Sequence, residues 1–200
     1  MYSPKSSQME ATLRVVRYVK SSPGLGILMK VADCVTLKAF CDADWASCPN
    51  TRRSITDYFV KFDSYLVSWK SKNQSTISKN SAEAEYRSSA ATVADLVWMI
   101  SLYKSIGVEV QLHVLIHCDS KSAIQIATTP VFHEHTKFID IDCHFIRENV
   151  QLKLVQLFYL ASSEQHADIL TKALTHMQHG YLLSKLGIKN IFITPGLRGC

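Results

Sequence analysis

The sequence lacks several features that would assign it to other classes of protein. No stretch approaches the roughly 20 continuous apolar residues that a membrane-spanning helix needs. No secretory signal precedes the six cysteines, and no Cys-x-x-Cys pair supports a zinc ribbon or a thioredoxin-like site. We therefore expect reduced thiols in an intracellular protein, and the sequence does not decide between cytoplasm and nucleus. A basic, serine-containing N-terminus leaves an organellar transit peptide as a less favoured alternative.

Glycine and proline are also scarce, with seven and five among 200 residues, whereas apolar residues make up 47%. This composition is typical of a globular protein with one sizeable domain and a short extension. The positive excess is small, because 22 Lys and Arg face 17 Asp and Glu, and it permits a polyanionic partner without requiring one. Residues 61–80 hold four lysines and a single acid. A solvated face explains such a run, and phosphate contact is the alternative that Trp69 favours.

Hydrophobic periodicity predicts an ordered series of strands and helices. Predicted helices cover 8–20, 82–105, 121–128, 139–150, 164–174 and 177–186, and predicted strands cover 26–29, 35–41, 58–62, 65–69, 114–118 and 154–160, with a third short hairpin strand over 74–78. A turn near Ala32 and Asp33 joins the first two strands. Strands that later alternate with helices imply a mixed sheet with parallel members and helices on its faces.

Four carboxylates stand out by their positions in this series. Asp42 and Asp119 end strands, whereas Glu85 and Asp168 lie near helix starts. Strand ends and helix starts of this kind converge at one edge of an open α/β sheet. Carboxylates gathered there repel one another unless a cation neutralises them, and such oxygen ligands select Mg²⁺ or Mn²⁺. Taken alone, each acid at a helix start is better explained by helix capping or by the helix dipole, so only the joint placement of the acids favours chemistry.

Neighbouring residues sort some of the roles. Glu83 and Glu85 are two apart on a helix and point to nearly opposite sides, so only one can face the site. Asp42 and Asp44 share a face if the strand continues, and chemistry alone does not choose between them. The small thiols of Cys41 and Cys118 alternate to the other face, where they suit the core.

The histidines support no better-defined site. The spacing of His133, His135, Cys143 and His144 fits no common structural zinc site. His117 alternates away from Asp119 and is expected to be structural. His166, two residues before Asp168, would assist product release only if it lies near the metals.

Seven segments, in order, carry a resemblance to a known family. They are Cys-Asp-Ala-Asp-Trp-Ala at 41–46, Thr-Arg-Arg-Ser at 51–54, Val-Ser-Trp-Lys-Ser-Lys at 67–72, Ser-Ala-Glu-Ala-Glu-Tyr-Arg at 81–87, His-Cys-Asp-Ser-Lys-Ser-Ala at 117–123, Thr-Lys-Phe-Ile-Asp-Ile-Asp-Cys-His-Phe-Ile-Arg-Glu at 136–148 and Gln-His-Ala-Asp-Ile-Leu-Thr-Lys at 165–172. Together they resemble the ribonuclease H region of copia-type retrotransposon Pol polyproteins, particularly those of plants.

The resemblance implies an α/β ribonuclease H-like fold, a five-stranded mixed sheet with helices on both faces, plus an N-terminal helical extension. It implies hydrolysis of the RNA strand of RNA–DNA hybrids with two Mg²⁺ ions, for which Mn²⁺ can substitute. The catalytic, metal-binding acids correspond to Asp42, Glu85, Asp119 and Asp168. The residues expected to contact nucleic acid are Arg52, Arg53, Lys70, Lys72 and Lys121.

The resemblance also divides the chain. Residues 1–30 resemble the connection to a reverse transcriptase, 31–190 the ribonuclease H-like domain, and 191–200 a C-terminal tail. The family usually has Gly in place of Asp57, a Gly-containing turn at residues 61–64, Arg in place of His135 and His in place of Phe138. No polymerase Asp-Asp motif occurs, which excludes DNA synthesis by this chain alone.

Three functions remain as hypotheses. The first is a metal-dependent hybrid ribonuclease. The second is a catalytically silent nucleic-acid-binding remnant of a truncated polyprotein. The third is an interaction partner of the missing reverse transcriptase, for which the helix face at Leu13 and Val16 would be the contact. The isolated chain is expected to be a monomer without a membrane partner.

Overall fold

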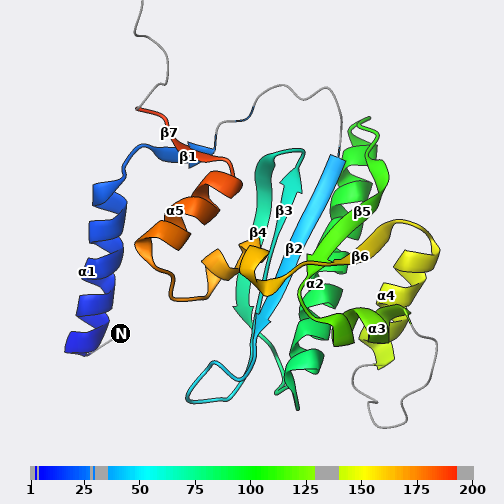
Figure 1. Ribbon diagram of the computed structural model, residues 1–200, viewed down its shortest axis with the longest axis horizontal. Coiled ribbons are helices and arrows are strands. Elements are labelled where there is room, and N and C mark those ends of the chain that lie inside the picture. Colours follow the sequence, from blue (N-terminus) through cyan, green and yellow to red (C-terminus); the bar gives the residue numbers. More distant parts are fainter. Residues whose placement is uncertain (1–2, 4, 28, 30–35, 129–139, 193–200) are drawn as a thin grey trace, which may run out of the picture.

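A five-stranded sheet forms the centre of the protein (Figure 1). The structure, a computed structural model, describes residues 3, 5–27, 29, 36–128 and 140–192. In sheet order the strands are β4 (Tyr65–Asn73), β3 (Ile55–Phe62), β2 (Thr36–Asp44), β5 (Gln111–Cys118) and β6 (Val155–Tyr159). The first three strands are antiparallel neighbours, and β5 and β6 continue the sheet in parallel with β2. The five-stranded mixed sheet is therefore confirmed.

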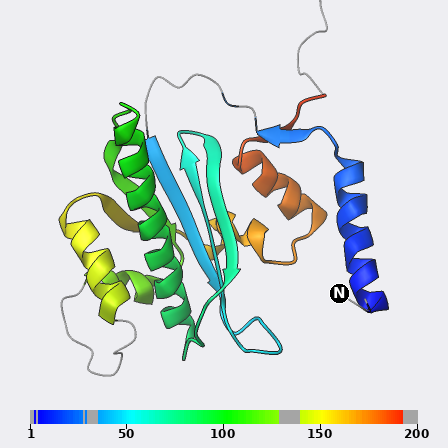
Figure 2. The same cartoon turned by 180° about the vertical axis from the view of Figure 1, so that it is seen from behind.

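Helices and short turns cover both faces of this sheet. The helices are α1 (Ser6–Ser21), α2 (Ser81–Ser105), α3 (Lys121–Thr128), α4 (Asp140–Gln151) and α5 (His176–Lys185), and the 3₁₀ turns are η1 (Ser162–Glu164) and η2 (His166–Leu170). Helix α2 crosses one face, as Figure 2 shows, while η1 and η2 cross the other. Among the described residues, no helix combines the length and apolar character needed to cross a membrane.

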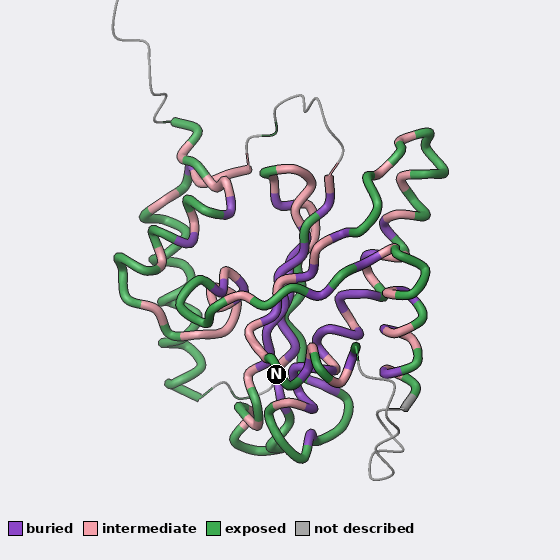
Figure 3. Tube along the Cα trace, turned by 45° about the vertical axis from the view of Figure 1, so that its right-hand side comes forward, coloured by how far each residue is buried: buried purple, intermediate pink, exposed green. Residues whose placement is uncertain are grey.

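The strands bury both of their faces because helical elements pack on each side. Toward α2, the larger core cluster contains Cys41, Tyr58 and Cys118 from the sheet, with Val93 and Leu96 from the helix. The opposite face holds a smaller cluster of five buried residues, which are Phe40, Phe59, Leu66, Ala167 and Leu186. Figure 3 shows buried residues concentrated in the central strands and α2. The two cysteines lie in the core, as their alternation along the strands predicted.

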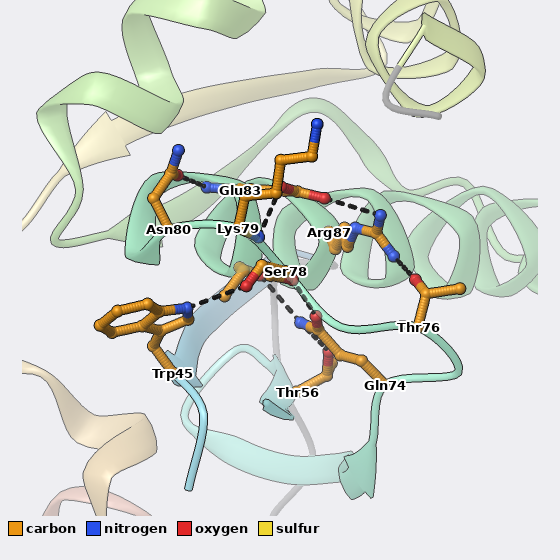
Figure 4. Close-up of polar contacts among 10 residues, drawn as sticks. Trp45, Thr56, Gln74, Thr76, Ser78, Lys79, Asn80, Glu83 and Arg87 are labelled. Atoms are coloured by element: carbon orange, nitrogen blue, oxygen red, sulfur yellow. Dashed lines mark hydrogen bonds and ion pairs between the residues drawn. The ribbon is translucent and has the colours of Figure 1, made fainter. Parts of the chain in front are cut away.

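The predicted strand over 74–78 is wrong, since these residues form a loop that leads into α2. The buried amide of Gln74 donates to Thr56 Oγ1 at 3.1 Å and to the Ala84 carbonyl at 3.0 Å. The Ser78 hydroxyl donates to Gln74 Oε1 at 2.8 Å, and the Trp45 indole donates to the Ser78 carbonyl at 3.1 Å (Figure 4). Hydrogen bonds that involve side chains therefore hold this loop, in place of the backbone hydrogen bonds that a further strand would have formed with its neighbour.

The predicted helix over 164–174 is also wrong. Residues 162–170 form two short 3₁₀ turns, so Asp168 lies in η2 rather than at the start of an α-helix. The fully buried Gln165 amide donates to the Cys41 carbonyl at 2.9 Å and its oxygen accepts from the Ala167 amide. This glutamine fixes the turn on the sheet, next to the strand that carries Asp42. Strand β2 itself continues to Asp44, three residues beyond the end of the predicted strand at 41.

The segment before the sheet is arranged differently from the prediction. Strand β1 (Leu25–Ile27) pairs antiparallel with β7 (Ile188–Asn190), not with β2. The predicted turn at Ala32 and Asp33 lies outside the described residues, as do His133, His135 and Phe138. Helix α1 has no buried residue and stands outside α5 (Figure 1). At the β3–β4 turn, Asp63 adopts φ +53°, a left-handed conformation that glycine adopts more readily.

Candidate metal centre

Asp42 lies on β2, where the parallel strands approach their carboxyl ends. Its side chain is nearly fully buried and forms an ion pair with Lys172, with 2.9 Å between Oδ2 and Nζ. The same ammonium lies 2.8 Å from Asp168 Oδ1. Burial raises the pKa of Asp168 to about 6. The bond to Lys172 lowers this pKa, whereas the charge of Asp42 raises it further. Two of the four predicted carboxylates therefore lie together, linked by a lysine.

Glu85, in the first turns of α2, belongs to the same cluster. Burial raises its pKa to about 10, and the nearby charges of Asp42 and Asp119 add to this effect. Its Oε2 is buried without a hydrogen-bond partner among the described residues. An orphaned buried carboxylate oxygen is costly unless a proton or a cation satisfies it.

Glu83, the neighbouring candidate, points elsewhere. Its carboxylate accepts from the Lys79 amide at 2.9 Å and pairs with Arg87 at 2.7 Å (Figure 4). Its backbone amide is capped by the Asn80 side chain at 2.8 Å. These contacts give Glu83 a structural role at the start of α2 and leave Glu85 as the residue beside Asp42.

Asp119 follows β5 directly and completes the group. Ligand atoms of Glu85, Cys118 and Asp119 lie within 4.8 Å of one another, a spacing that suits a bound metal ion. The Ser162 hydroxyl donates to Asp119 Oδ2 at 2.7 Å and orients this carboxylate. All four predicted acids therefore gather at one edge of the sheet, from β2, α2, the end of β5 and η2.

Asp57 is an unexpected fifth acid at this edge. It lies on β3 opposite Asp42 and is fully buried. Its Oδ2 accepts from the Thr171 hydroxyl at 3.2 Å, whereas Oδ1 has no partner among the described residues. Burial raises the pKa of Asp57 to about 8, and the charge of Asp42 adds to it. This carboxyl group is therefore largely protonated at neutral pH in the metal-free protein.

The predicted nucleic-acid contacts lie at three separate places, all exposed. Arg52 and Arg53 lie in the loop after β2, and Lys121 begins α3 two residues beyond Asp119. Lys70 and Lys72 line a hollow of about 420 Å³ beside α2, on the edge strand β4. Trp69 lines a different groove, beside α1 and α5, so it does not interleave with these lysines.

The two histidines near the cluster belong to an aromatic stack. The rings of His117 and His166 each lie 4.6 Å from the ring of Phe40, centroid to centroid. Burial lowers the pKa of His117 and lowers that of His166 to about 4. Both rings are therefore uncharged at physiological pH, which fits the structural role expected for His117 and means that His166 is not an imidazolium that could act as a general acid.

Sequence reasoning missed Lys172, Asp57, Cys118 and Ser162 as parts of this cluster. Lys172 had a usable signal, because it follows Asp168 by four residues, a spacing at which side chains meet in helical turns. Asp57 had only its departure from the usual glycine. Cys118 was assigned to the core alone, and nothing local to Ser162 indicated its bond to Asp119.

Comparison with known proteins gives two curated relatives that match almost the whole chain. The Pol polyprotein from transposon RE1 of Arabidopsis thaliana is 35% identical over 191 residues, covering 96% of this chain and 13% of the relative. The Pol polyprotein from transposon RE2 of the same plant is 35% identical over 199 residues, covering 100% and 14%. No protein-family model matches the chain.

Among solved structures, the chain is similar to the N-terminal ribonuclease H domain of Rv2228c from Mycobacterium tuberculosis. The TM-score is 0.49 at 14% sequence identity, with 75% of this chain and 97% of that chain covered. The ordered motifs and the end-to-end matches to the transposon polyproteins carry the assignment. The chain belongs to the retrovirus-related Pol polyproteins of copia-type plant transposons and spans about one eighth of their length.

Proposed function

We propose that this chain hydrolyses the RNA strand of RNA–DNA hybrids in a reaction that depends on divalent metal ions. The observation that supports this proposal is the convergence of Asp42, Glu85, Asp119 and Asp168 at one sheet edge. Carboxylates packed so closely destabilise one another unless cations join them. Burial raises the pKa values of Glu85 and Asp168, and repulsion from the charge of Asp42 raises them further.

The donor atoms fit the ions that the resemblance implies. Carboxylate oxygens prefer Mg²⁺ or Mn²⁺, and the orphaned Oε2 of Glu85 offers a buried oxygen ready for an ion. Asp42, Glu85 and Asp119 would hold one ion, and Asp42 with Asp168 a second. When bound, two such ions activate a water and stabilise the leaving oxygen of an in-line phosphoryl displacement. Ser162 keeps the Asp119 carboxylate oriented toward the cluster.

A cleavage assay tests the proposal. Purified chain is incubated with an RNA–DNA hybrid labelled on the RNA strand, in Mg²⁺, in Mn²⁺ and in excess chelator. We expect cleavage that requires the metal and is lost in Asp119→Asn, with duplex DNA of the same sequence left intact. Cleavage that persists in chelator or in Asp119→Asn contradicts the proposed site. Binding without cleavage would instead favour the silent nucleic-acid-binding remnant.

Phosphate contact by the β4 lysines gives a separate prediction. We expect Lys70→Gln with Lys72→Gln to weaken hybrid binding and to flatten its salt dependence, since fewer counterions are released. The slope of log K against log salt should fall by about one to two units. Fluorescence anisotropy of a labelled hybrid at several salt concentrations measures it. The matched control is Lys104→Gln with Lys189→Gln, which removes equal charge elsewhere, and an equal slope change there contradicts the assignment.

The reverse transcriptase part of the parent polyprotein is the partner that we propose for residues 1–30. The chain spans only 13% of the RE1 polyprotein, and α1 leaves apolar side chains in solvent, with Val15 62% and Val16 54% exposed. An apolar helix face without cover is typical of a contact with another part of a protein. Protease resistance of α1 in the isolated chain would count against this partner.

A further inference from the structure

Lys172 occupies a specific position inside the carboxylate cluster. Its Nζ lies 2.9 Å from Asp42 Oδ2 and 2.8 Å from Asp168 Oδ1, so one ammonium bridges two of the acids. Its backbone amide donates to the Asp168 carbonyl at 2.9 Å. The preceding residue, Thr171, is held by its hydroxyl to the buried Asp57. The lysine is therefore positioned by its own turn and by β3, rather than meeting the acids by chance.

The bridge replaces a cation that these acids otherwise need. The Asp42 side chain is only 3% exposed and that of Asp168 17% exposed, so water screens their charges poorly. One ammonium neutralises one of the two negative charges. The burial of Lys172 lowers its pKa, but its bonds to Asp168 and Asp42 outweigh that effect and raise it overall. The lysine therefore stays charged at the position it holds.

An ion and the ammonium cannot share these oxygens. A metal ion held by Asp42 Oδ2 and Asp168 Oδ1 would need the space between these oxygens that Nζ fills at 2.9 and 2.8 Å. Two positive centres that close repel strongly in a poorly screened site. The Lys172 side chain is 36% exposed, so its flexible stem has a path into solvent. The Glu85 and Asp119 side of the cluster has no such lysine among the described residues.

We propose that Lys172 is an internal competitor for the divalent ion at the Asp42–Asp168 position. The first ion enters on the Glu85–Asp119 side, and the second binds only when it displaces the Lys172 ammonium. This inference rests on the proposed function in one respect, that the same carboxylates hold metal. It adds that occupancy of the second position is set by a residue of the chain itself.

Counting bound Mn²⁺ without nucleic acid tests this inference. The electron paramagnetic resonance of free Mn²⁺ is followed as protein is titrated, for the full chain and for Lys172→Met. We expect the unchanged chain to bind one ion tightly and a second weakly. In Lys172→Met the second ion should bind at least about tenfold more tightly, a coupling of ordinary size. Equal or weaker binding by Lys172→Met overturns the inference, and so does no binding by either protein.

Three variants separate competition from general disturbance. Lys189 is an exposed residue of β7, and Lys189→Met should leave the affinities for both Mn²⁺ ions unchanged. Lys172→Arg keeps the positive charge and should not show the gain. Lys172→Met combined with Asp168→Asn should lose the gain, because the second position then lacks a ligand. A gain that survives Asp168→Asn, or appears in Lys189→Met, overturns the assignment.

Thermal unfolding supplies a second readout and a check on folding. Without metal, Lys172→Met should unfold at lower temperature, since Asp42 and Asp168 lose their cation, and saturating Mn²⁺ should raise its Tm more than that of the unchanged chain. If Lys172→Met does not fold, Lys172→Gln replaces it in both measurements, because glutamine keeps a neutral hydrogen-bond donor at this position. Neither measurement involves hydrolysis, so a chain that binds Mn²⁺ as expected but leaves hybrid intact refutes the nuclease proposal and not this one.

Discussion

Glu85→Gln is expected to abolish hybrid cleavage while leaving a protein at least as stable as the original in the absence of metal. The loss of activity should reach about a thousandfold, because a metal ligand contributes several kcal/mol to the transition state. The stability follows from the pKa of about 10, since the buried carboxyl keeps its proton at neutral pH. Glutamine imitates that neutral form without requiring a proton.

The sign of the stability effect can be worked out. The pKa of Glu85 is raised above its ordinary 4.5 in the folded protein, so the folded state holds a proton that the unfolded state has released. Stability contributed by this group therefore falls as pH rises from about 4.5 to about 10. Glu85→Gln removes that loss, and Tm measured in chelator should exceed that of the unchanged chain at pH 8. Added Mn²⁺ should raise the Tm of the unchanged chain more than that of Glu85→Gln, which loses one of the ligands.

Glu83→Gln is the matched control, two residues away on the same helix. Its carboxylate pairs with Arg87 and accepts from the Lys79 amide, so the change should cost about 1 kcal/mol of stability. Cleavage should persist. If Glu83→Gln removes activity and Glu85→Gln retains it, the two glutamates have been assigned the wrong way round.

Asp57→Asn should stabilise the metal-free protein and flatten its pH dependence. Asp57 is fully buried and its pKa is raised from 3.8 to about 8, so its contribution to stability falls as pH rises through this window. Asparagine stays neutral and can still accept from Thr171. The gain at pH 8 should amount to a few kcal/mol, as expected for a buried carboxyl group that no longer has to ionise.

Thermal or urea unfolding between pH 6.5 and 8.5, in chelator, measures this effect. Below pH 6.5 the half-buried His166 acts in the opposite direction, because its pKa is lowered to about 4 and the unfolded chain takes up a proton there first as the pH falls. The control is Glu109→Gln, an exposed acid, which should leave the pH profile unchanged. An Asp57→Asn profile parallel to that of the unchanged chain would show that Asp57 is already ionised in the folded protein, which contradicts the prediction.

Periodicity was sufficient for most of the fold. The stripe of Ala90, Val93 and Val97 predicted α2, and the short apolar run at 114–118 predicted β5. A helix that is buried on one face has apolar residues at helical spacing, and a strand that is buried on both faces is a continuous apolar run. Both patterns can be recognised in the sequence alone. The position of Asp42 at a strand end and the resemblance of the motifs then indicated the acids that meet at the sheet edge.

What periodicity missed depends on contacts between distant segments. Gln165 holds the turn at 162–170 to the sheet through its hydrogen bond to the Cys41 carbonyl. No local sequence pattern predicts a 3₁₀ turn that is fixed by such a distant contact. The segment at 74–78 was predicted as a strand, but it is a loop held by hydrogen bonds from side chains such as Gln74 and Ser78, which the pattern of apolar residues does not show. The link between Lys172 and Asp42 joins residues 130 positions apart, and spacing along the chain cannot reveal it.

The pairing of β1 with β7 has a consequence for how this segment is carried within a longer polypeptide. Gly26 lies opposite Lys189 in a separate two-stranded sheet, so the segments before and after the five-stranded sheet run side by side, about 4.8 Å apart. A unit whose entry and exit meet in this way can be joined head to tail or inserted into a surface loop of another protein with little rearrangement. A segment transferred in this way would include Asp42, Glu85, Asp119 and Asp168 together.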